Sequence, residues 1–204
     1  ALLRAGLNEA TDVAFLLGDR ARALRMVDTL LRRQRLDTMT GFVRREYLAL
    51  VTAYAFAGEP VSARRAMQEW DAKRASFRQS LDANVLESMA GLVDLASGRY
   101  REAALELRHS AAQGCVRCVR AAEGMAWEKA GDADSAITTY ERYLDTPELL
   151  WEESDSFYLP TVYQHLATLY EARNDRERSV QHYRTFIALW STADPELQPA
   201  VRAA

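Results

Sequence analysis

The sequence predicts an all-α protein, a solenoid of about five helix–turn–helix units. Apolar residues recur with the helical period of 3.6 residues in successive stretches, and none of these stretches alternates with the strand period of two. A second pattern, Gly or Asn followed five residues later by a small residue, recurs along the chain. Repetition of this kind is typical of an array in which neighbouring copies bury each other's apolar faces.

The repeated pattern marks the turn between two helices. Its anchors lie 40, 40, 33 and 43 residues apart and are Gly18, Gly58, Gly98, Gly131 and Asn174. The small residues that follow them are Ala23, Ala63, Ala103, Ala136 and Ser179. Gly and Asn most readily adopt the left-handed conformation that ends a helix. The small residue near the start of the second helix is expected to let the two helices pack closely.

These anchors define the expected domain organisation. We place the units near residues 4–37, 44–77, 84–113, 117–145 and 160–193, followed by the start of a C-terminal capping helix over 194–204. Residues 1–204 are interpreted as a single domain. Because the chain begins with Ala1 and stops at Ala204 within an expected helix, we interpret it as a fragment of a larger protein.

Composition and motifs exclude several classes of function. The 204 residues are 49% hydrophobic and 27% charged, with a net charge of −3, which is typical of a folded protein and gives no general attraction to nucleic acid. No apolar run is long enough to span a membrane. The sequence has no phosphate-binding glycine loop, no zinc-protease motif and no nucleophile elbow, and His109, His165 and His182 show no ligand spacing. We therefore expect no enzymatic activity, no metal and no cofactor.

The pattern resembles the tetratricopeptide repeat, in which large, small and aromatic residues occupy fixed positions of a 34-residue unit. The best-matched unit begins at Pro160 and continues with Tyr163, Leu166, Ala167, Tyr170, Ser179, Tyr183 and Phe186. The next best has Gly124, Trp127, Ala136, Tyr140 and Tyr143, with Glu123 in place of the usual Leu. In the units near Arg4 and Asn84, Ala14 and Asp94 stand where the family has Tyr.

The resemblance implies a right-handed superhelix with a concave face formed by the first helix of each unit. Family members contact ligands mostly through first-helix positions two, five, nine and twelve, and these positions are Asn8, Asp12, Leu48, Thr52, Ser88, Leu92, Ala121, Met125, Glu128, Gln164, Thr168 and Glu171. None is Lys, which disfavours the carboxylate clamp of chaperone-binding members. The apolar to mildly acidic lining suits a peptide with apolar or basic side chains.

The resemblance therefore implies a protein–protein interaction scaffold that binds a peptide or protein partner in the concave groove. The expected binding residues are Thr52, Ser88, Leu92, Met125, Glu128, Gln164 and Thr168. The C-terminal unit is similar to the repeat tails of bacterial serine/threonine kinases and transcriptional activators. This similarity implies the non-catalytic arm of a larger, cytoplasmic regulator, or an extracytoplasmic arm if the kinase spans a membrane. Self-association through the terminal helices is a further expectation.

The pair Cys115 and Cys118 supports an alternative function. It follows Gly114, where the first helix of the fourth unit is expected to begin, and a helix N-terminus stabilises a thiolate. The pair fits two small packing residues, a redox-active dithiol, or two of four zinc ligands with His109 as a third. The alternative is a ligand- or redox-sensing regulatory domain that uses this pair or the groove.

The segment 146–160, TPELLWEESDSFYLP, is predicted to be a long connection before the last unit. A connection so rich in aromatic residues either folds over the edge of the core or forms a lip that faces a partner.

Overall fold

The structure is a computed structural model that describes residues 2–34, 36, 44–77, 83–113, 119–146 and 155–204. In these residues it contains eleven α-helices and no strand, which confirms the predicted all-α class. The helices are α1 (Leu2–Leu16), α2 (Arg20–Arg33), α3 (Arg44–Phe56), α4 (Pro60–Phe77), α5 (Ala83–Ala96), α6 (Tyr100–Gln113), α7 (Arg120–Lys129), α8 (Ala133–Leu144), α9 (Asp155–Ala172), α10 (Arg176–Trp190) and α11 (Gln198–Ala203).

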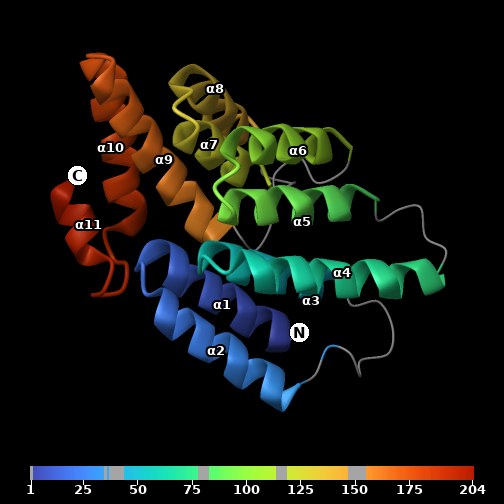
Figure 1. Ribbon diagram of the computed structural model, residues 1–204. Helices are drawn as coiled ribbons and strands as arrows, with labels where there is room; N and C mark the ends of the chain where they lie inside the picture. The colour runs from blue at the N-terminus through green and yellow to red at the C-terminus, as the bar shows by residue number, and fades with distance from the viewer. Residues whose placement is uncertain (1, 35, 37–43, 78–82, 114–118, 147–154) are drawn as a thin grey trace.

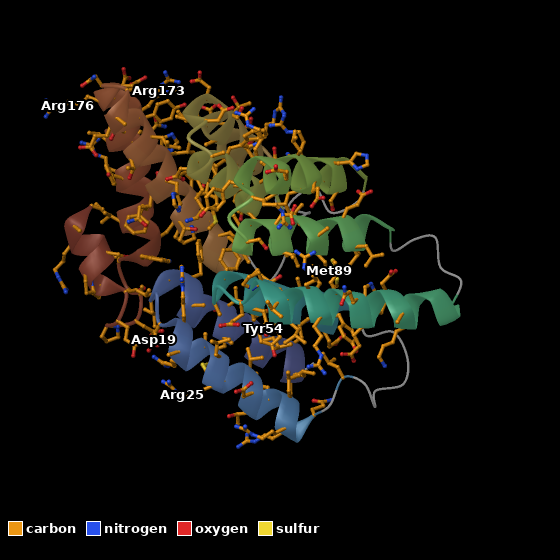
Figure 2. All side chains as sticks on the ribbon, in the orientation of Figure 1. Asp19, Arg25, Tyr54, Met89, Arg173 and Arg176 are labelled. Atoms are coloured by element: carbon orange, nitrogen blue, oxygen red, sulfur yellow. The ribbon has the colours of Figure 1, made fainter. Side chains whose placement is uncertain are left out.

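The first ten helices pack as five sequential pairs, α1–α2 to α9–α10 (Figure 1). The first helices of the first three pairs lie side by side, with α3 between α1 and α5. Further along the chain the packing between pairs changes, since α7 packs on α6, the second helix of the preceding pair, and α9 contacts α8. Met89 of α5, which is fully buried, lies on the side of α5 that faces the α3–α4 pair (Figure 2).

The turns within the pairs have the conformation that the sequence predicts. All five anchor residues have positive φ: 66° at Gly18, 77° at Gly58, 78° at Gly98 and Gly131, and 59° at Asn174. In the last four turns the next residue's N–H reaches back to a carbonyl five residues earlier, as in the bond from Asp132 to Trp127 at 2.9 Å. Asp19, Asp132 and Asp175 then cap the second helix through their carboxylates.

Small residues allow the two helices of a pair to approach closely. Four of the five small residues predicted for the second helices, the alanines, are completely buried. The first helices carry glycines at two equivalent positions of the third and fourth pairs. A Cβ added to Gly91 would lie 2.6 Å from Cγ of Leu107, and one added to Gly124 would lie 2.6 Å from Cδ1 of Tyr140. The second helix therefore fills the space that a side chain would need.

Glu123, which replaces the usual Leu of the repeat pattern, is buried between α6, α7 and α8. Its Oε1 accepts hydrogen bonds from Nε of Arg108 at 2.9 Å, from Nε1 of Trp127 and from the hydroxyl of Thr139, both at 3.3 Å. The Arg108 guanidinium also lies 5.0 Å from the centre of the Trp127 ring. Each of α6, α7 and α8 thus donates one hydrogen bond to the buried Glu123 carboxylate. These bonds offset the free-energy cost of burying its charge.

The last helix pair meets the first through an aromatic contact. The ring of Tyr158 in α9 lies 5.9 Å from that of Phe15 in α1 and 6.3 Å from that of Phe56 in α3, and Phe15 and Phe56 lie 4.9 Å apart. Tyr158 is only 3% exposed. We call this cluster the closing contact. It brings the beginning of α9 against the first two pairs, as Figure 1 shows.

The closing contact corrects the predicted start of the last unit. We expected a connection up to residue 160, but α9 begins at Asp155, so Pro160 lies inside the helix. The burial of Tyr158 against the first two pairs explains why the helix extends beyond the repeat pattern. After α10, the capping helix expected over 194–204 is short, since only Gln198–Ala203 is helical. The same C-terminal segment also reaches α2, where Arg22 pairs with Glu196 at 3.3 Å.

We expect Gly124→Ala to lower the free energy of unfolding by about 1–3 kcal/mol, because the added methyl group overlaps the Tyr140 ring. Ala is otherwise the better helix former by about 1 kcal/mol. Urea denaturation would measure the change. The control is Ala167→Gly at the equivalent position of α9, where the native methyl group is completely buried and its removal should lower stability by about 1–2 kcal/mol. A stabilised Gly124→Ala variant would contradict the close approach.

Candidate functional site

The structure divides the predicted groove residues into buried and accessible ones. Ser88, Leu92 and Met125 are buried, at 3%, 2% and 8% exposure. The other four are at least partly exposed: Thr52, Glu128, Gln164 and Thr168. The seven positions therefore do not form one continuous accessible groove.

The contacts of the buried positions explain why they differ from the expectation. The Ser88 hydroxyl lies 2.5 Å from that of Ser110 in α6, so this side chain faces the second helix of its own pair. Leu92 and Met125 belong to the same hydrophobic cluster as Tyr158 of the closing contact. The expectation that Ser88, Leu92 and Met125 line a ligand site is thus not met, because their side chains are part of the core.

Glu128, although partly accessible, already has partners inside the chain. Its Oε2 accepts hydrogen bonds from Nδ1 of His165 at 2.8 Å and from the Tyr140 hydroxyl at 3.1 Å. The His165 and Tyr140 rings stack with their centres 5.6 Å apart. Burial acts to raise the pKa of Glu128, but the hydrogen bonds from His165 and Tyr140 outweigh it and leave the pKa below its usual value. Glu128 therefore joins α7, α8 and α9 and is not free for a ligand.

The two threonines make local hydrogen bonds that leave one side of each accessible. The Thr52 hydroxyl donates to the Leu48 carbonyl at 2.8 Å, and that of Thr168 lies 3.1 Å from the Gln164 carbonyl. Thr168 also lies 3.3 Å from the Tyr183 hydroxyl of α10. Such bonds to the preceding turn are common for helical threonines and do not by themselves indicate a ligand.

Asp12 is the residue whose environment departs most from that of an ordinary surface carboxylate. It lies on α1 at a groove position implied by the resemblance, and its Oδ1 is buried with no hydrogen-bond partner among the described residues. Burial, and to a smaller extent the charge of Glu9, raise its pKa from 3.8 to about 7. Nothing in the sequence distinguishes Asp12 from other groove positions; its burial and missing partner are tertiary properties.

The position of Asp12 is fixed by the closing contact. Asp12 lies one helical turn before Phe15, and Thr52 lies one turn before Phe56 on the neighbouring helix. The Phe15 and Phe56 rings touch where α1 packs against α3, so Asp12 and Thr52 each lie about one turn before this contact on neighbouring helices. We call the surface made by Asn8, Asp12, Leu48 and Thr52 the α1–α3 face.

The three histidines, all among the described residues, have partners that are not metal ligands gathered at one site. His109 pairs with Glu87 at 3.0 Å, and His182 stacks on Tyr170 with ring centres 5.5 Å apart. Burial lowers the pKa of His182. Within the described ranges no three His, Cys, Asp or Glu residues gather as metal ligands. Cys115 and Cys118 lie outside the described residues, so the redox alternative stays a prediction.

Comparison of the chain with protein-family models, curated proteins and solved structures found no match. Among the helices that the structure describes, none is long and apolar enough to cross a membrane. The fold therefore defines the class of protein as an all-helical protein of paired helices.

The raised pKa of Asp12 predicts a specific pH dependence of stability. The folded state favours the neutral Asp12 carboxyl. The contribution of this group to the stability of the fold is therefore fully present below pH 3.8 and is lost as the pH rises through about 7. Converted directly, a pKa shift of this size corresponds to about 4 kcal/mol in the free energy of unfolding. Since Asp12 is partly exposed, we expect screening to reduce it to roughly 1–2 kcal/mol.

Asp12→Asn should therefore gain stability relative to the parent chain as the pH rises from 4 to 8. Urea denaturation at several pH values would measure the difference between the two proteins. Asp28→Asn, on the exposed surface of α2, is the control. An Asp12→Asn difference that stays constant with pH would show that the carboxylate is fully solvated.

Proposed function

We propose that the chain is a non-catalytic protein-interaction module, a right-handed solenoid of tetratricopeptide-like units that forms an arm of a larger regulator. Its ligand is a peptide segment with a basic side chain, bound on the α1–α3 face. The observation that carries this proposal is Asp12, a partly buried carboxylate with no hydrogen-bond partner for Oδ1 among the described residues. Burying an acidic group without a hydrogen-bond partner costs free energy, and a ligand that supplies the partner would remove this cost.

The chemistry of the α1–α3 face suits such a peptide. A Lys or Arg side chain of the ligand would pair with Asp12 and favour its charged form, with the negative charge of Glu9 nearby. Asn8 and Thr52 offer neutral polar groups, and the half-buried Leu48 offers an apolar contact one turn from Thr52. The burial of Leu92 and Met125 limits the ligand to the first two helix pairs.

The test uses a library of short fluorescent peptides that differ at one central position, which is Lys, Arg, Gln or Glu. Fluorescence anisotropy with the 204-residue chain should detect binding of members with a central Lys or Arg. Asp12→Asn should weaken this binding about tenfold, the effect of losing about 1.4 kcal/mol. Asp28→Asn, the matched control, should leave it unchanged.

The pH dependence of binding provides an independent check. Because a basic side chain pairs with the charged form of Asp12, binding should weaken as the pH falls from 8 to 6. Equal binding of peptides with Gln and Lys at the central position, or an Asp12→Asn variant that binds as the parent does, would refute the proposal.

A further inference from the structure

The α7–α8 and α9–α10 pairs share the same turn conformation and one recurring hydrogen bond, 43 residues apart, and are called the first and second copy. The left-handed residue of the turn is Gly131 in the first copy and Asn174 in the second. The same hydrogen bond also recurs, since the Tyr140 hydroxyl donates to Glu128 at 3.1 Å and the Tyr183 hydroxyl donates to Glu171 at 3.2 Å. Residues at equal positions can therefore be compared directly.

In the first copy, α9 packs against the surface formed by Glu128, Tyr140 and Glu141. Ile137 of α8 is 4% exposed and Tyr140 is completely buried. Three polar contacts join α9 to this copy. His165 binds Glu128 at 2.8 Å, and the two others pair Tyr170 with Glu141 and Arg173 with Asp134. A helix with an apolar and a charged side is thus seated on the first copy.

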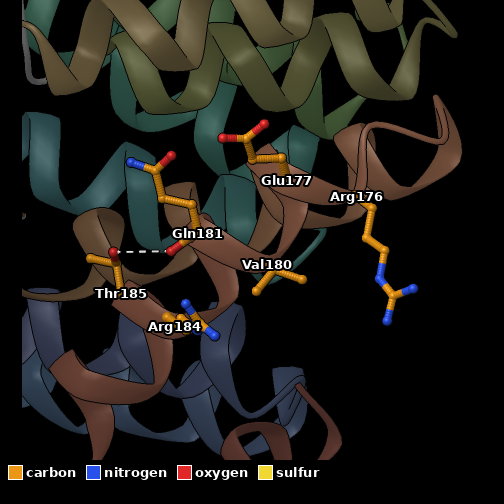
Figure 3. Close-up of a pocket in the computed structure, with 6 residues that line it drawn as sticks. All are labelled: Arg176, Glu177, Val180, Gln181, Arg184 and Thr185. Carbon is orange, nitrogen blue, oxygen red and sulfur yellow. Dashed lines mark hydrogen bonds between the residues drawn. The ribbon is translucent and has the colours of Figure 1, made fainter.

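In the described part of the chain, the equivalent surface of the second copy is more exposed. Val180, which corresponds to Ile137, is 37% exposed, and Ile187, which corresponds to Leu144, is exposed to the same extent. A surface hollow of about 690 Å³ follows α10 and is lined by Arg176, Glu177, Val180, Gln181, Arg184 and Thr185 (Figure 3). We call this surface, together with Glu171 and Ile187, the outer face of α10. Arg176 lies at the same end of the pair as Arg173 (Figure 2).

The charges of the outer face indicate what could cover it. Glu177 stands in the position of Asp134, so the counterpart of Arg173 should again be a base. Glu171 stands in the position of Glu128, which binds His165. Arg184 stands in the position of Glu141, so the charge is reversed, and an acid should replace the Tyr170 hydroxyl donor.

We propose that the outer face of α10 binds an amphipathic α-helix of a partner protein, which runs antiparallel to α10. Its contact side carries a base, an acid five residues later and a second base three residues after that, as in the spacing of His165, Tyr170 and Arg173. Apolar residues lie between them, as Leu166 and Leu169 do in α9. The antiparallel direction follows from the first copy, where the end of α9 meets the beginning of α8. This surface is distinct from the α1–α3 face.

The probe is a fluorescent peptide of residues 160–173 that carries Tyr170→Glu and is held helical by a covalent link on its solvent side. It reproduces the helix that already fits the first copy and adds the acid that Arg184 requires. Anisotropy titration with the whole 204-residue chain should show saturable binding. Arg184→Glu should weaken binding at least about tenfold, and a peptide with Tyr170→Lys should restore it to that variant.

Two controls make the result specific. Arg64→Glu, an equal charge reversal on the exposed side of α4, should leave binding unchanged. Val180→Asp should abolish binding while circular dichroism and urea denaturation stay as in the parent, because Val180 is exposed. Absence of saturable binding, or binding that is unaffected by Arg184→Glu, overturns the proposal. A concentration-dependent dimer of the parent chain that Val180→Asp dissociates in sedimentation also overturns it, since the occupant would then be a second copy.

Discussion

The close approach of two helices across a small residue is the constraint on which this fold depends. A left-handed residue reverses the chain within a few positions, so the second helix must lie directly against the first. Gly124 shows the consequence, since the Tyr140 ring occupies the space of a side chain. Because a pair this thin cannot bury both of its apolar sides, neighbouring pairs must stack.

Stacking alone would leave a long open groove, and the closing contact changes that. Tyr158 joins the last pair to Phe15 and Phe56 of the first two, and the core that includes Tyr158 also takes up Leu92 and Met125. Leu92 of α5 and Met125 of α7 are buried, whereas Asp12 of α1 and Thr52 of α3 stay partly exposed. Asp12 lies on α1 with its Oδ1 buried and without a hydrogen-bond partner among the described residues, and the proposed ligand site is based on this feature.

Polar residues in place of aliphatic ones have two different consequences in this chain. Glu123 and Glu128 are satisfied by residues of neighbouring helices and so fix how the third to fifth pairs join. Glu171 repeats the role of Glu128 with Tyr183 but has no helix beyond it in the described chain to supply a counterpart of His165. The same Tyr–Glu pair therefore joins helices within the chain in one copy and forms part of a candidate binding surface in the next.

The sequence by itself determined the helical class, the pairing and the turns, because these depend on periodicity and on residues such as Gly131 and Asn174 whose backbone preferences are local. It also marked Glu123 as a departure from the pattern. The tertiary structure alone decided that Ser88 is buried, that Oδ1 of Asp12 has no hydrogen-bond partner among the described residues, and that α9 begins before Pro160. These properties depend on contacts between residues far apart in the chain, such as Tyr158 with Phe15, and no local pattern specifies which of several apolar faces will be covered.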